Sequence, residues 1–142
     1  MNPIEAGLRR FLLVMGGMSC VALPVELLLD GHTESRVQLL PFVLCGLLLA
    51  GTLAFARWTG RTTGRLLRLA CTIAGLGGVF GMWEHIAHNY TFEAEIRPTA
   101  PTGTLLWEAL QGASPLLAPG ALLLVALLLG AATWRHPALQ RR

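Results

Sequence analysis

Two groups of carboxylates and histidines mark the ends of apolar stretches in this chain, and these residue types can bind metals or exchange protons. Glu26 is still inside an apolar run, so its carboxylate is expected to face the interior of the helix bundle or a wet cavity. In a helix, Glu84 and His88 are spaced to meet on one surface, as are His85 and His88. The first group consists of Glu26, Asp30, His32 and Glu34, and the second of Glu84, His85, His88 and Asn89.

Three interpretations of this cluster are open. The first is a structural network in which carboxylates hydrogen-bond to histidines, with Arg36 or Arg97 as counter-charge. The second is a transition-metal site for zinc, copper or iron, because histidines and carboxylates bind all three. The third is a proton relay or pH sensor, because a buried carboxylate beside a histidine can titrate near neutral pH. The predicted metal ligands are Glu26, His32, Glu84, His85 and His88.

Two more specific metal centres are disfavoured. A di-iron bundle needs Glu-x-x-His on two helices, and the sequence has this motif on neither segment. Paired haem ligands should come from two helices at one depth, but only one apolar segment offers helical histidines there. His136 is predicted on the opposite side of the membrane. Haem is therefore the weaker choice of cofactor.

The composition indicates a membrane protein. The chain has 142 residues, of which 54% are hydrophobic and 13% charged, with a mean hydropathy of +0.57. An average soluble domain is about 25% charged. This shortage of charge excludes a disordered chain, a nucleic-acid-coating protein and an ordinary soluble enzyme domain. The length is that of a single domain, residues 1–142.

Four apolar segments are long enough to cross a membrane, which takes about 20 residues. Their apolar residues do not alternate with polar ones, so they predict helices rather than barrel strands. Small residues in them, such as Gly77 and Gly81, are expected to pack helices together or to form a dimer face. Cys20, Cys45 and Cys71 are interpreted as small packing residues. The predicted architecture is all-α, an antiparallel four-transmembrane-helix bundle with spans at about 11–29, 37–56, 69–87 and 116–134.

The arginines predict the orientation. Nine of the 11 lie before the first span, between the second and third, or after the fourth, and only Arg36 and Arg97 lie on the other side. The positive side should be cytoplasmic, which places both termini inside. Basic residues are exclusively arginine, which with the abundant Ala, Leu and Gly points to a GC-rich bacterial genome. The expected location is therefore the bacterial inner membrane, where four tryptophans would lie near the two interfaces: Trp58, Trp83, Trp107 and Trp134.

The outer loop, residues 89–114, is expected to cap the outer end of the bundle. Residues 91–97 alternate polar and apolar types, which predicts a short extended segment. Residues 105–110 predict a short interfacial helix. The outer residues expected to face a partner are Asp30, Glu34, Asn89, Glu93, Glu95, Trp107 and Glu108.

In topology, the chain resembles small uncharacterised four-helix proteins of bacterial inner membranes. The stretches that carry this resemblance are 26–41, 83–88 and 107–120, and it implies no activity. Small multidrug-resistance transporters fit less well, because they use a glutamate deep in the first helix whereas Glu26 is near the outer end. We expect a non-enzymatic accessory or assembly subunit of a membrane complex. The alternatives are a metal-binding membrane protein with its site at the periplasmic face, and a small proton-coupled transporter. The expected partners are lipid and a membrane protein or a second copy, and no nucleic acid.

Overall fold

The regular structure of the protein is helical throughout the described part of the chain. The computed structural model describes residues 2–112, 114 and 116–140. The all-α prediction is confirmed, whereas Arg141 and Arg142, used above to predict orientation, lie outside the described residues. The helices are α1 (Pro3–Leu29), α2 (Leu40–Arg57), α3 (Arg61–Ile96), α4 (Thr102–Leu110), α5 (Leu117–Ala132) and α6 (Pro137–Gln140).

Three of these helices, α1, α2 and α3, are long and apolar enough to cross a membrane. The fourth predicted span forms α5, which is apolar but has only 16 residues. At about 1.5 Å per residue it is roughly 24 Å long, shorter than a hydrocarbon core of roughly 30 Å. α1 begins earlier than the apolar pattern predicts, because Asn2 caps it by accepting a hydrogen bond from the Ile4 amide and Pro3 suits a first helical turn.

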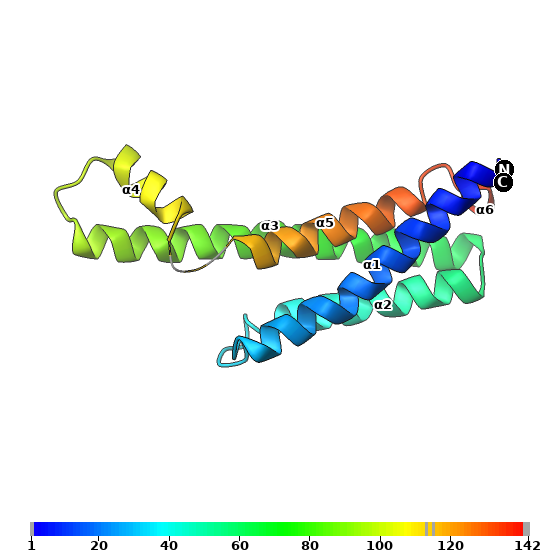
Figure 1. Cartoon of the computed structure of the whole chain (residues 1–142), viewed down its shortest axis with the longest axis horizontal. Coiled ribbons are helices and arrows are strands. Elements are labelled where there is room, and N and C mark those ends of the chain that lie inside the picture. The colour runs from blue at the N-terminus through cyan, green and yellow to red at the C-terminus, as the bar shows by residue number, and fades with distance from the viewer. Residues whose placement is uncertain (1, 113, 115, 141–142) are drawn as a thin grey trace.

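The long helices pack in a closed order in which α1 contacts α2 and α5, and α3 also contacts α2 and α5 (Figure 1). The turn between α2 and α3 and both ends of the chain lie at one end of the molecule, which we call the inner end. The opposite, outer end holds the α1–α2 connection and α4. Leu48, Leu67 and Leu129 are fully buried and form the centre of the core.

Small residues allow the close helix contacts, as predicted. A Cβ at Gly78 would lie 2.9 Å from the Pro119 carbonyl oxygen, so α3 and α5 are nearly in backbone contact there. Gly16 makes the matching approach of α1 to Leu129 of α5. Gly46 of α2 differs, because it is exposed and a Cβ there would have no neighbour within 4 Å. All three cysteines are free thiols buried in the core, in agreement with a packing role.

The extended segment predicted at residues 91–97 is wrong, because α3 continues through Ile96. Phe92 and Ile96 are four residues apart, a spacing that suits one helix face as well as an alternating strand. Arg97 also forms an ion pair with Glu93 across one helical turn, which favours the helix. As a result α3 extends beyond the ends of the other long helices, and α4 folds back along this extension (Figure 1).

Candidate functional site

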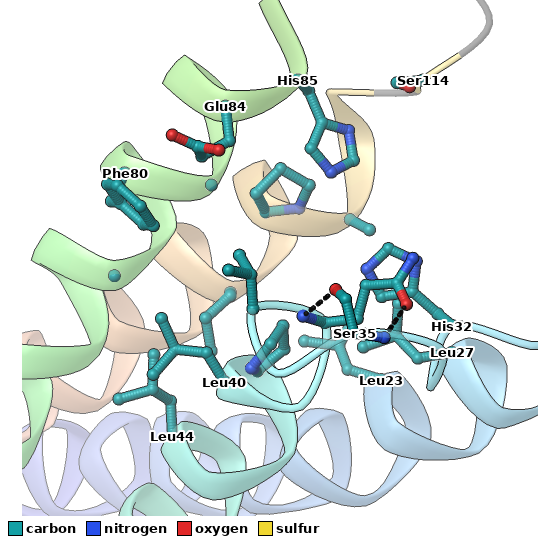
Figure 2. A pocket seen from close by; sticks show the side chains of 18 of the residues that line it. Leu23, Leu27, His32, Ser35, Leu40, Leu44, Phe80, Glu84, His85 and Ser114 are labelled. Carbon is teal, nitrogen blue, oxygen red and sulfur yellow. Dashed lines mark hydrogen bonds between the residues drawn. The ribbon is translucent and has the colours of Figure 1, made fainter. Parts of the chain in front are cut away.

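A cavity of about 780 Å³ opens at the outer end, between the α1–α2 connection, α3 and the start of α5 (Figure 2). Its volume lies within the range of small-molecule sites, roughly 300–1,000 Å³. Leucines and Phe80 form its inner part, and polar side chains surround its mouth. The polar lining residues are Asp30, His32, Ser35, Gln38, Glu84, His85, His88 and Ser114.

A glycine turn at the end of α1 positions the first group of these residues. Gly31 has a left-handed backbone conformation, with φ of 67°. The Gly31 amide donates to the Leu28 carbonyl, and the His32 amide donates to the Leu27 carbonyl at 2.8 Å. This pairing is the Schellman motif, in which a residue without a Cβ ends a helix cheaply. It leaves Asp30 as the C-cap of α1, and His32, which follows the turn, lines the cavity.

The connection that follows is held by a reciprocal pair of hydrogen bonds. The Ser35 amide donates to Oε1 of Gln38 at 2.9 Å, and the Gln38 amide donates to Oγ of Ser35 at 3.3 Å (Figure 2). Two backbone donors are thereby satisfied just before α2 begins. Ser35 and Gln38 were not among the predicted site residues, although their three-residue spacing before an apolar run is a capping signal.

The second group of site residues lies on α3, just before the part of this helix that extends beyond the other long helices. His85 faces His32 across the cavity mouth, with ring centroids 6.3 Å apart (Figure 2). Within the described structure, Nδ1 of His85 is buried and has no hydrogen-bond partner. Glu84 and His88 are exposed and also line the cavity. Residues distant in the sequence therefore line one cavity here.

Four of the five predicted metal ligands line this cavity, and Glu26 does not. Glu26 is on α1 and is exposed. In the part of the chain that the structure describes, no three histidine, cysteine or acidic side chains are grouped so that they could hold a metal ion. The arrangement is therefore that of a cavity with separate polar groups around its mouth.

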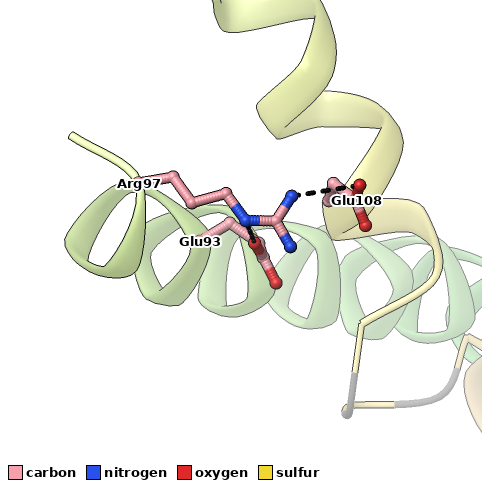
Figure 3. Close-up of polar contacts among 3 residues, drawn as sticks. All are labelled: Glu93, Arg97 and Glu108. Atoms are coloured by element: carbon pink, nitrogen blue, oxygen red, sulfur yellow. Dashed lines mark ion pairs between the residues drawn. The ribbon is translucent and has the colours of Figure 1, made fainter. Parts of the chain in front are cut away.

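A second feature of the outer end is the outer hairpin, residues 89–112, in which the end of α3 pairs with α4. Arg97 joins the two helices: its Nε lies 3.5 Å from Oε2 of Glu93 and its Nη1 lies 3.1 Å from Oε1 of Glu108 (Figure 3). These carboxylates raise the pKa of Arg97, mainly through the hydrogen bond to Glu108. Arg97 is thus a counter-charge, but for carboxylates within the hairpin and not for those of the cavity.

Asn89 stabilises the base of the outer hairpin, where the hairpin begins on α3. Its Nδ2 donates to the carbonyl oxygens of Ala109 at 2.9 Å and Ser114 at 3.0 Å, and its Oδ1 accepts from the Ser114 amide at 3.1 Å. Asn89 is buried, so it holds the fold rather than facing a partner. Nothing in the sequence identified Ser114, because its contribution comes from backbone atoms.

The other residues predicted to face a partner have different surroundings. Glu34, Glu95 and Trp107 are exposed, so they are accessible on the outer surface. Glu93 and Glu108 are half-buried and form the ion pairs with Arg97. Asp30 lines the cavity.

Comparisons of this chain with protein-family models, with curated proteins and with solved structures give no match.

Proposed function

We propose that α1, α2, α3 and α5 form an antiparallel four-helix bundle across a bacterial inner membrane, with both termini in the cytoplasm. Large apolar side chains are exposed along the middle of these helices, as lipid contact requires, including Val21, Leu53, Leu76 and Leu124. The arginines of the α2–α3 turn lie at the inner end together with both termini, which agrees with the positive-inside rule. Leu116 and Trp134 add apolar side chains just outside the two ends of the 16-residue α5.

Within that membrane, we infer that the protein acts as a non-enzymatic accessory or assembly subunit, and that the outer hairpin carries its partner surface. The observation behind this proposal is the length of α3. Its 36 residues correspond to about 54 Å, which exceeds a bilayer of about 40–45 Å including headgroups. Its last two turns, with α4, therefore project from the membrane on the outer side.

The projecting outer hairpin is both apolar and rigid. Phe92, Ile96 and Leu106 are exposed on it, and Trp107 is 64% exposed. Leu105 and Ala109 are buried against α3, and Arg97 and Asn89 link α4 to its surroundings. Exposed apolar groups on an ordered surface outside the lipid are typical of protein–protein contact sites. A second membrane protein with an apolar outer segment is the expected partner.

Native gel analysis of membranes solubilised in mild detergent tests this proposal. The wild-type protein should migrate in a complex larger than the single chain. The double substitution Phe92→Ser and Trp107→Ser removes two exposed apolar anchors without changing a buried contact. We expect it to release the chain to the size of the free protein.

The matched control is the double substitution Ile4→Ser and Leu8→Ser, which removes exposed apolar side chains from the inner end of α1. This variant should remain in the complex. A wild-type chain that runs as a lone monomer, or a complex that survives the outer substitutions, would contradict the proposal.

A small transporter is the second candidate, and the cavity is the observation that favours it. Core residues such as Leu48 and Leu129 do not line the cavity and are fully buried, so the centre of the bundle is packed. A carrier would therefore need a second, inward-open arrangement of the helices. A metal-binding function receives no support from the described residues, because their potential ligands are not grouped.

A further inference from the structure

The cavity at the outer end combines two chemically different parts. Its inner part is formed by apolar side chains from all four long helices, including Leu27, Leu44, Phe80 and Leu122. These residues offer no polar group to a ligand, so this part accepts an apolar body. A hydrophilic solute would gain nothing there and would lose its water.

The mouth of the cavity carries two carboxylates beside three histidines, His32, His85 and His88. Asp30 and Glu84 contribute carboxylates from two different walls, α1 and α3. The described lining residues include no arginine, and the chain contains no lysine. The ion pairs within the described structure join Arg97 to Glu93 and Glu108 only, so they leave both mouth carboxylates for another positive charge.

We propose that this cavity binds an amphiphilic cation, meaning a molecule with an apolar body and one permanent or protonated positive centre. The apolar part of the ligand fills the space among the leucines and Phe80, and its positive centre lies at the mouth, where Asp30 and Glu84 carry negative charge. The two carboxylates repel an anion of the same size and shape, so the sign of the ligand's charge decides binding.

Equilibrium dialysis with two ions of equal shape tests this assignment. Tetraphenylphosphonium and tetraphenylborate differ mainly in the sign of their charge, and both are large enough to report on an apolar site. The full chain is dialysed in non-ionic maltoside micelles, and binding to empty micelles is subtracted. We expect the cation to bind at least tenfold more tightly than the anion.

The double substitution Asp30→Asn and Glu84→Gln should weaken cation binding at least tenfold. Among the described residues, neither of these two side chains forms a hydrogen bond or an ion pair, so their replacement leaves the polar contacts of that part of the fold intact. Glu34→Gln with Glu95→Gln is the matched control, because it removes the same charge from two positions that do not line the cavity, on the α1–α2 connection and on α3. That control should bind the cation within twofold of the wild type.

Two results would overturn the proposal: equal binding of the cation and the anion, or an equal loss in the cavity variant and in the control. A further arm distinguishes the natural source of the cation once tetraphenylphosphonium binding is established. Displacement by added phosphatidylethanolamine identifies a lipid amine, and absence of displacement identifies a free amphiphilic solute. This test does not involve the outer hairpin, so it stands or falls separately from the partner surface.

Discussion

At the scale of single residues, Asn89 explains why the outer end is ordered. Its amide side chain satisfies three backbone groups, contributed by Ala109 and Ser114. A buried polar group that loses its partner costs about 1–3 kcal/mol. Gly112 packs against it so closely that a Cβ there would lie 2.5 Å from Cγ of Asn89. The Asn89 side chain and the absence of a Cβ at Gly112 together hold the end of α4 against α3.

Asn89→Leu should loosen the outer hairpin while leaving the core of the bundle intact. The substitution leaves the Ala109 carbonyl and the Ser114 amide without their partner, at a cost of about 1–3 kcal/mol for each group that remains buried. Hydrogen exchange measured by mass spectrometry should then be faster in residues 102–112 and unchanged in α2.

Gly112→Ala should have the same effect through steric overlap with Asn89. Thr91→Val is the control, because it removes an exposed hydroxyl that bonds only within its own helix, to the Ala87 carbonyl. Unchanged exchange in α4 of the Asn89→Leu protein would show that other contacts hold the hairpin.

At the scale of elements, two arginines from different helices close the end of α5. Nη1 of Arg9 donates to the Ala132 carbonyl at 3.0 Å, and Nη2 of Arg68 donates to the Thr133 carbonyl at 2.6 Å. The last carbonyls of a helix lack partners within it and carry a partial negative charge, so cations stabilise this end. Arginines predicted to set the topology thus also join α1 and α3 to α5.

His136 makes this inner end sensitive to pH. Its ring packs edge-on against Phe55, with centroids 5.1 Å apart. Burial lowers the pKa of His136, and the neighbouring Arg9 and Arg68 lower it further. The folded protein therefore disfavours the protonated imidazole, so its stability is fully present above the ordinary histidine pKa of about 6.5 and declines as pH falls through that value.

We expect the thermal midpoint of the wild-type protein in detergent to fall between pH 7.5 and pH 5. His136→Gln should reduce this dependence, because the side chain no longer takes up a proton in the unfolded state. His88→Gln, at an exposed position of the outer end, serves as the control and should keep the wild-type profile. An unchanged pH profile in His136→Gln would refute the assignment.

At the scale of the whole molecule, the number of crossings decides where the termini lie. If α5 spans with the other three helices, both termini share one side of the membrane, as their common position at the inner end suggests (Figure 1). If only α1, α2 and α3 span, the termini lie on opposite sides.

Reporter fusions show directly whether three or four helices cross the membrane. Green fluorescent protein should be fluorescent at either terminus, and alkaline phosphatase should be active when inserted after Ala100, in the turn between α3 and α4. Phosphatase inserted after Thr59, in the α2–α3 turn, is the control and should be inactive. If alkaline phosphatase fused to the C-terminus were active, α5 would not cross the membrane.

Much of the fold could be predicted from local pattern. Long apolar runs must form helices in lipid because only intra-segment hydrogen bonds satisfy their backbone there, and α1, α2 and α3 appear where such runs occur. The pattern failed at residues 91–97, where Phe92 and Ile96 can share a helix face as well as a strand face. Tertiary pairing with α4 through Arg97 favours the helix there, and no local rule contains that information.

The sequence by itself determined the helical class, the placement of charge at the two ends, and the outer location of the carboxylates and histidines, because these follow from composition and spacing along one chain. Only the tertiary structure decided which of them share a cavity. It places Asp30, His32, Glu84 and His85 around one mouth, leaves Glu26 outside, and uses Asn89 to hold the hairpin. The reason is geometric: a helix pattern states which residues share a face, but the packing of α1, α2, α3 and α5 decides which faces meet.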